Sequence, residues 1–304
     1  MKIAQLRTLV AIVDSKSFAL AAEQLFITPS AISHQMRDLE NELGVELFDR
    51  ATRPPKLNSH GYAVVDRGRD VLARFDTLVE LARSPGEIGG RLMLGCVSGV
   101  SSDLIPLALA RLRTSHPAVQ VNIEEGLSDT LANRVRRREL DAAIITELTE
   151  PDPELKSLLI TEEAMMVVAP PECRLTQWQD VLTAYPFIRL NRNAGMGKII
   201  DRSLRENRVL VNEAMELDSS EAIVGMARAG LGAGVVPAGR LRLVPDGDVF
   251  TLPFGEPPIQ RRVALIERSN NPRSDLSELV YDAVMQVTAG VVVSSPEAGL
   301  SIHA

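Results

Sequence analysis

The chain is poor in the residues on which catalysis and metal binding most often depend. Its 304 residues include only four histidines and two cysteines. No histidine stands in a metal-ligand spacing or in a Ser/His/Asp arrangement, and no nucleotide-binding loop is visible. Cys96 and Cys173 are far apart in sequence, which favours two ordinary thiols in a reducing compartment over a redox-sensing pair. The sequence therefore predicts a protein that is not an enzyme and holds neither metal nor cofactor.

Long apolar runs are also absent. No stretch approaches the roughly 18 apolar residues that cross a bilayer. The first residues, MKIAQLRTLVAIV, are interrupted by Arg7, and no small-residue cleavage site follows them. Apolar residues make up 45% and charged residues 24%, the balance of a soluble globular protein. We therefore expect a cytoplasmic protein of two or three compact units.

Positive charge is scarce, which taken alone argues weakly against a protein that binds nucleic acid. The formal net charge is −7 over the whole chain and −1 over residues 1–90. Any contact with DNA must therefore come from a local positive surface and not from the bulk charge.

Four segments follow from the pattern of apolar residues. Short helical patterns fill residues 1–58, and a long helical pattern with a break at Ser84-Pro85-Gly86 fills residues 59–90. Residues 91–290 alternate strands with helices, which predicts an α/β domain with a parallel sheet. Residues 291–304 are expected to form a loose tail.

The first segment has three short helices with clear start and stop signals. Ser17 is a good N-cap for the second helix, and Thr28 followed by Pro29 starts the third. Gly44 ends the third helix, where a left-handed residue is favoured. The expected buried positions lie on one face of each helix: Ile3, Leu6, Leu9, Val10 and Val13; Leu20, Ala21, Ala22 and Leu25; Ala31, Ile32, Met36, Leu39 and Leu43.

The second and third helices have the spacing of a helix-turn-helix. In such a motif the second helix, here Pro29–Leu43, enters the major groove of DNA. Its polar side chains can reach base edges or phosphates, and a helical hairpin with a solvated polar face is the alternative. The candidate DNA contacts are Ser30, Ser33, His34, Gln35 and Arg37.

A basic segment follows the third helix. Two short extended pieces around Pro54-Pro55 predict a wing, and no acid lies between residues 50 and 65. Arg50, Arg53 and Lys56 are therefore candidate phosphate contacts that set register without reading sequence. A solvated surface loop is the alternative.

The run SFALAAEQLFITPSAISHQMRDLENELGVELFDR resembles the DNA-binding signature of LysR-type transcription regulators. The match covers the head closely and the rest of the chain more loosely. The chain departs from the signature at Leu57-Asn58, where the family often has Leu-Thr, but Asn caps a helix equally well. The matching residues are Ser17-Phe18-Ala19, Ala21-Ala22-Glu23, Leu25, Ser30-Ala31-Ile32-Ser33, Gln35, Leu39-Glu40, Leu43-Gly44, Leu47-Phe48 and Arg50.

The long helix after Asn58 carries an apolar stripe. Ser59–Leu81 would extend about 35 Å, too far to bury that stripe against three small helices. Pairing with a second chain is one solution, and packing on the C-terminal domain is the other. The resemblance implies a dimer through this helix, with assembly into tetramers. The stripe consists of Tyr62, Val65, Leu72, Phe75, Leu78 and Leu81.

The resemblance implies that residues 91–290 form a two-lobed domain like a periplasmic binding protein. The chain is expected to cross to lobe II (163–267) near Glu162 and to return to lobe I (91–162 and 268–290) near Arg268. Ligands of such sheets bind beyond the carboxyl ends of the strands, at helix N-termini.

Several hydroxyl, amide and guanidinium groups lie at the expected strand ends. Hydroxyls beside backbone N–H groups favour an anionic ligand, often a carboxylate. Ordinary helix capping is the alternative for each hydroxyl, and a surface ion pair is the alternative for Arg189. The candidate effector contacts are Ser98, Ser101, Ser102, Ser128, Thr146, Arg189, Asn191 and Ser219.

These features together predict a sequence-specific, DNA-binding transcription regulator controlled by a small-molecule effector. The alternatives are a cytoplasmic small-molecule binding protein without a specific DNA target and an architectural DNA-binding protein without an effector. The absence of a leader argues against a periplasmic carrier.

Overall fold

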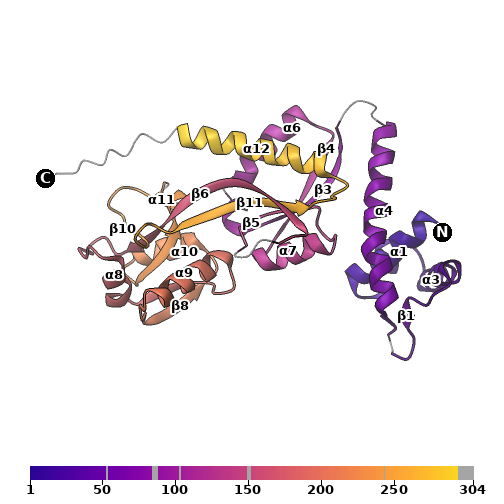
Figure 1. Ribbon diagram of the computed structural model, residues 1–304, viewed down its shortest axis with the longest axis horizontal. Helices are drawn as coiled ribbons and strands as arrows, with labels where there is room; N and C mark the ends of the chain where they lie inside the picture. The colour runs from indigo at the N-terminus through magenta and orange to yellow at the C-terminus, as the bar shows by residue number, and fades with distance from the viewer. Residues whose placement is uncertain (53, 84–87, 103, 149–151, 243, 294–304) are drawn as a thin grey trace. The chain divides into compact units, whose positions relative to one another are not determined.

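The computed structural model describes residues 1–52, 54–83, 88–102, 104–148, 152–242 and 244–293 (Figure 1). Arg53, the break at Ser84-Pro85-Gly86 and residues 294–304 of the expected tail therefore lie outside the described residues. The chain divides into two compact units, with the division after Gly90.

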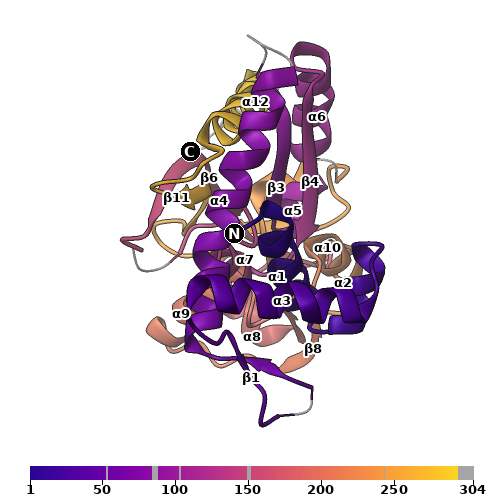
Figure 2. The same cartoon turned by 90° about the vertical axis from the view of Figure 1, so that its right-hand side faces the viewer.

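The first unit is a small helical head followed by one long helix (Figure 2). Its elements are α1 (Ile3–Ser15), α2 (Phe18–Gln24), α3 (Pro29–Leu43), β1 (Phe48–Asp49), β2 (Lys56–Leu57) and α4 (Ser59–Arg83). The antiparallel β1–β2 hairpin forms the wing that the sequence predicts. Residues from all three short helices, the wing and the start of α4 share one core, which includes Leu9, Ala21, Ile32, Leu47 and Val65.

Local signals place the ends of the head helices where the sequence predicts them. The Ser17 hydroxyl accepts a hydrogen bond from the Leu20 amide, and the Thr28 hydroxyl accepts one from the Ala31 amide. Gly44 ends α3 with φ of 72°, in the left-handed region that glycine adopts without strain.

Two of the expected core positions are wrong. The side chains of Leu20 and Leu43 are 50% and 38% exposed, because each lies at the edge of its helix's apolar stripe. In the long helix, Val65 is buried in the head core, whereas Tyr62, Val71 and Leu78 are exposed. The side chain of Leu81 lies outside the described residues.

The second unit is built on a sheet of nine strands among the residues that the structure describes. The strand order is β4-β3-β5-β11-β6-β9-β7-β8, and β10 pairs with β6. Their bounds are β3 (Gly90–Cys96), β4 (Val119–Glu125), β5 (Ala142–Thr146), β6 (Leu155–Ala169), β7 (Phe187–Leu190), β8 (Glu213–Leu217), β9 (Ala233–Pro237), β10 (Phe250–Pro253) and β11 (Gln260–Arg268).

Helices pack against the sheet in each half. Lobe I has α5 (Ser98–Ser101), α6 (Leu104–Ser115), α7 (Ser128–Arg136) and α12 (Ser274–Val293). Lobe II has α8 (Trp178–Ala184), α9 (Gly195–Glu206), α10 (Ser220–Arg228) and α11 (Ala238–Leu241). In lobe I, α6 and α12 pack on one face of the sheet and α7 on the other, so that the central strand β5 is buried on both sides (Figure 1).

The sheet is mixed and not wholly parallel. β3 and β5 are parallel, as are β7, β8 and β9, in agreement with the strand–helix alternation. However, β11 runs antiparallel to both β5 and β6. The reason is that β6 and β11 are the two strands that cross between the lobes, and they run in opposite directions. The sequence pattern predicts parallel pairs from a helix between two strands, so it does not reveal this antiparallel pair.

The crossing points follow from the pairing of these two strands. Residues of β6 up to Ala164 pair with β11 in lobe I, and residues from Met165 pair with lobe II strands. The first crossing is therefore close to the expected Glu162. The return comes earlier than the expected Arg268, because β11 already pairs with β5 of lobe I at Val263.

Candidate nucleic-acid interface and ligand cavity

The N-terminal half of α3 presents a polar face to solvent. Ser30, Ser33, His34 and Arg37 are all exposed. The Ser33 hydroxyl donates to the Pro29 carbonyl at 3.0 Å, and the His34 ring lies 2.9 Å from an Asp38 carboxylate oxygen. Four of the five side chains that the sequence assigned to DNA from this helix thus share one accessible face.

Gln35 lies elsewhere on α3. Its Oε1 accepts a hydrogen bond from the buried Thr8 hydroxyl of α1 at 2.6 Å, and its side chain is only partly exposed. This bond ties α3 to α1, so the structure gives Gln35 a role in packing the head. The sequence pattern did not show this partner, because Thr8 is 27 residues away.

The wing is anchored by one buried acid. Glu40 is 6% exposed, and its Oε1 accepts hydrogen bonds from the amides of Leu47 and Phe48 at 2.8 and 3.2 Å. Its second oxygen accepts from the Arg50 guanidinium. Arg50 is therefore held against Glu40, although half of its side chain remains exposed. Lys56 is exposed on β2, and Arg53 is among the residues not described.

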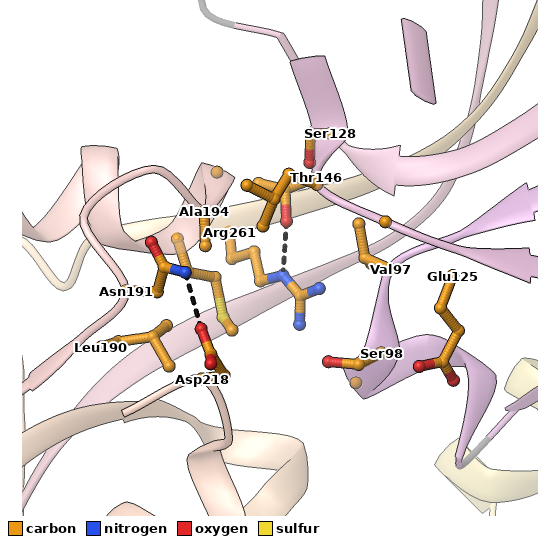
Figure 3. A pocket seen from close by; sticks show the side chains of 15 residues that line it. Val97, Ser98, Glu125, Ser128, Thr146, Leu190, Asn191, Ala194, Asp218 and Arg261 are labelled. Carbon is orange, nitrogen blue, oxygen red and sulfur yellow. Dashed lines mark hydrogen bonds between the residues drawn. The ribbon is translucent and has the colours of Figure 1, made fainter. Parts of the chain in front are cut away.

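A cavity of about 270 Å³ lies where the strands of both lobes end (Figure 3). β3, β4 and β5 reach it from lobe I, and β7 and β8 reach it from lobe II, as expected for the carboxyl ends of an α/β sheet. Its lining consists of Val97, Ser98, Gly99, Glu125, Gly126, Leu127, Ser128, Thr146, Leu190, Asn191, Ala194, Gly195, Met196, Asp218 and Arg261.

Arg261 is the cation of this cavity. It lies on the crossing strand β11, and its side chain is 4% exposed. Its Nε donates to the Thr146 hydroxyl at 3.1 Å, and its Nη1 donates to Glu163 on β6 at 3.0 Å. Burial lowers the pKa of the Arg261 guanidinium, and the nearby Glu163 carboxylate opposes that shift. The other carboxylate oxygen of Glu163 accepts from the Gly239 amide at 3.2 Å, which joins the cation to lobe II.

Two helix N-termini also face the cavity. α7 begins at Ser128, whose buried hydroxyl has no hydrogen-bond partner among the described residues. α9 begins at Gly195 behind Ala194, which provides no side-chain cap for its first amides. Uncapped N–H groups and the helix dipole together favour an anion. A Cβ at Gly195 would lie 2.9 Å from the Thr146 Cβ and 3.0 Å from the Ser128 hydroxyl, so glycine permits this close approach.

The structure brings together half of the predicted effector contacts. Ser98, Ser128, Thr146 and Asn191 line the cavity. Ser101 does not line the cavity itself, but its hydroxyl donates a hydrogen bond to the carboxylate of the lining residue Glu125.

The other three predicted contacts lie outside the lining. The Ser102 hydroxyl donates to the Ser98 carbonyl, and Ser219 caps α10 by accepting from the Ala222 amide, which is the capping alternative. Arg189 is buried in lobe II and paired with Asp201 and Glu213. Arg189 therefore forms ion pairs, as the alternative interpretation expected, but it does so in the interior of lobe II and not on the surface.

Sequence reasoning missed Arg261, Glu125 and Asp218. Glu125 and Asp218 follow the same strand-end rule that selected the serines, so they were accessible to it. The same rule could not find Arg261, because this residue lies near the start of β11 and not at its end. The residues next to it in the sequence do not indicate that it contacts Thr146 and Glu163.

Other kinds of site find little support. Among the described residues, no three His, Cys, Asp or Glu side chains are grouped to hold a metal ion, and no helix is long and apolar enough to span a membrane. Cys96 is fully buried, and burial raises the pKa of its thiol to about 12, so it stays protonated at neutral pH. Cys173 is also buried and free.

Comparison with known proteins agrees with this architecture. Residues 3–62 match the family described as bacterial regulatory helix-turn-helix protein, lysR family, and residues 85–289 match the LysR substrate binding domain. A probable RuBisCO transcriptional regulator of Cyanidioschyzon merolae is 30% identical over 242 residues, which cover 76% of this chain and 80% of that one. YfeR of Shigella flexneri, an HTH-type transcriptional regulator, is 26% identical over 92% of both chains.

Solved structures share the fold over nearly the whole chain. Full-length OxyR from Pseudomonas aeruginosa superposes with a TM-score of 0.71 at 24% identity, covering 93% of this chain and 94% of that one. CbnR in complex with its target DNA gives a TM-score of 0.59 at 19% identity, covering 94% and 100%. The chain therefore belongs to the LysR family of transcription regulators, with an N-terminal helix-turn-helix and a two-lobed effector-binding domain.

Proposed function

We propose that this protein binds specific double-stranded DNA through α3 and the wing, and that a small molecule held between the lobes regulates that binding. The observation that carries the DNA part is the exposed polar face of α3, which directly follows the capped turn of a helix-turn-helix. The N-terminal residues of this helix are the ones that contact bases in such motifs.

The head residues divide into two roles. Ser30, Ser33 and His34 offer donors and acceptors to base edges, whereas Arg37 and Lys56 offer positive charge to phosphates. We assign Arg50 mainly to holding the wing against Glu40, and Gln35 to holding α3 against α1.

A salt-resolved DNA titration of the full-length protein tests these roles. Target sites are first selected from a random library, and affinity for a selected site is then compared with affinity for random DNA. Lys56→Ala is expected to weaken both complexes equally and to reduce the salt slope by about one. His34→Ala or Ser33→Ala is expected to reduce the preference for the selected site.

A matched control is Arg113→Ala, which removes the same charge from α6 of the effector domain and is expected to change neither affinity. Failure to select any preferred site, by a folded protein, would contradict the proposal of sequence-specific binding.

The cavity supplies the regulatory part of the proposal. Arg261, two helix N-termini and the unpartnered Ser128 hydroxyl favour a ligand with an anionic group. The ligand would contact both lobes, so its affinity depends on their spacing, which is the differential binding that regulation requires. Across the same cleft, Lys198 of α9 forms an ion pair with Asp129 of α7.

We also propose that the protein acts in the cytoplasm as a homodimer that assembles into tetramers, and that it catalyses no reaction. The exposed Val71 and Leu78 support pairing through α4, because they lie seven residues apart on one side of the helix. Leu78→Arg is expected to give monomers by light scattering, with weaker DNA binding. Unchanged dimers would place the dimer contact elsewhere.

A further inference from the structure

The cavity contains two carboxylates, Glu125 and Asp218, that lack a salt bridge among the described residues. Glu125 is the last residue of β4 in lobe I, and Asp218 directly follows β8 in lobe II. Both line the cavity and are exposed. Neither forms an ion pair with any described side chain, whereas the neighbouring acids Glu124, Asp129 and Glu163 do. In Figure 3, Glu125 and Asp218 lie on either side of the Arg261 guanidinium.

Neutral groups orient both carboxylates. The Ser101 hydroxyl donates to Glu125, and the Asn191 amide donates to Asp218 at 2.6 Å. These bonds fix the position of the carboxylates without cancelling their charge. An acid on an ordinary surface is solvated by water and needs no neighbouring side chain to orient it. The two oriented carboxylates are therefore typical of a preorganised binding site.

Arg261 provides the positive charge of the cavity, but one carboxylate of the protein already pairs with it. The Glu163 carboxylate accepts a hydrogen bond from the Arg261 Nη1, so this guanidinium is already paired with one carboxylate of the protein. Its Nη2 donates to no group among the described residues, and the Ser128 hydroxyl beside α7 is also unpartnered. These two groups can still receive a carboxylate from a ligand.

The charges together restrict what the cavity can hold. A ligand with only negative charge would lie beside Glu125 and Asp218, and one with only positive charge would lie beside Arg261. A ligand that carries both charges meets complementary groups at each end. Val97, Leu190 and Met196 provide apolar surface for a short carbon chain. The volume of about 270 Å³ lies just below the usual range for ligand pockets, which favours a small molecule.

We propose that the effector is a small amino-carboxylate. Its carboxylate binds Arg261, Ser128 and the α7 N-terminus, and its ammonium group is attracted to Glu125 and Asp218. Because these two acids belong to different lobes, the ammonium group draws the lobes together. This inference rests on the proposed function of the cavity, and it adds the chemical class of the ligand.

The first experiment is calorimetric titration of the full-length protein with a fixed panel. The panel contains the twenty common α-amino acids, β-alanine, 4-aminobutyrate and 5-aminovalerate. Each binder is then compared with the carboxylic acid that lacks its amine and with the amine that lacks its carboxylate. We expect at least one binder whose two truncated analogues each bind roughly tenfold more weakly or worse.

The second experiment removes the acids while keeping their shape. Glu125→Gln and Asp218→Asn are each expected to weaken the amino-carboxylate roughly tenfold and to leave the amine-free carboxylic acid equally bound or bound more tightly. Glu124→Gln is the matched control, because Glu124 is the preceding residue of β4 but pairs with Arg134 and does not line the cavity. It is expected to bind as the wild type does.

Three results would overturn the inference: no binder in the panel, an amine-free acid that binds as tightly as its parent, or full affinity in both variants. An amine-free acid that binds the cavity and changes DNA affinity would overturn only the ligand class and would leave the proposed function standing. A binder that never changes DNA affinity would instead contradict the proposed function.

Discussion

Glu40→Ala should release the wing from the helix-turn-helix. Glu40 is the single side chain that accepts both the Leu47 and Phe48 amides, and it also receives Arg50. Alanine at this position leaves two buried amides without an acceptor. The wing then loses its polar attachment to α3 and keeps only its apolar contacts with the head core, although no residue expected to touch DNA has changed.

The magnitude follows from these three contacts. A buried hydrogen bond to a charged group contributes about 1.5–3 kcal/mol, so two lost bonds cost about 3–6 kcal/mol. The Arg50 pair adds at most about 1 kcal/mol, since half of that side chain is in water. Glu40→Gln keeps an oxygen for the amides and loses the charge, so we expect a cost of about 1–2 kcal/mol. The free energy of unfolding of a domain is about 5–15 kcal/mol, so the alanine substitution removes a large part of it.

Hydrogen–deuterium exchange in the full-length protein measures this effect directly. In Glu40→Ala the peptide spanning residues 44–57 should exchange more than a hundredfold faster, since 1.4 kcal/mol corresponds to tenfold. Glu40→Gln should fall between that variant and the wild type. Glu42→Ala, which changes a half-exposed acid of the same helix, should leave this peptide unaffected. Equal protection of the peptide in the alanine variant and the wild type would refute the anchoring role of Glu40.

Three further predictions concern single contacts. Gln35→Ala, which breaks the bond between α3 and α1, should lower the stability of the head by about 1 kcal/mol and weaken specific and random DNA alike; an altered preference between sites would instead mean that it reads bases. Gly197→Ala should lower the melting temperature of the effector domain in calorimetry, because its Cβ would lie 2.0 Å from the Asn191 carbonyl oxygen; an unchanged value would mean that α9 shifts freely. The hydrogen bond from Arg189 lowers the pKa of Glu213, so its ionised form stabilises lobe II above its ordinary pKa of 4.5, and this contribution is lost as the pH falls through the lowered value. The difference in melting temperature between wild type and Glu213→Gln should therefore shrink below pH 4.5, and a constant difference would exclude this linkage.

The sequence alone determined the features that depend on neighbouring residues. Thr28 with Pro29 and Gly44 fixed the ends of α3, because capping and left-handed turns are decided within about four residues. The helix-turn-helix resemblance extended this to the family, which the comparisons confirm. The strand-end rule also found Ser98, Ser128, Thr146 and Asn191, since the ends of parallel strands gather at one edge of a sheet whatever their order.

Only the tertiary structure decided which distant residues meet. Gln35 and Arg50 carry the residue types of DNA contacts, and the fold also brings them to Thr8 and Glu40 within the head. Arg189 and Arg261 both lie on buried strands of the sheet, yet one is enclosed by acids of lobe II and the other reaches Thr146, 115 residues away. The physical reason is that a guanidinium binds whichever carboxylate or hydroxyl the fold brings within about 3 Å, and no local periodicity records that distance.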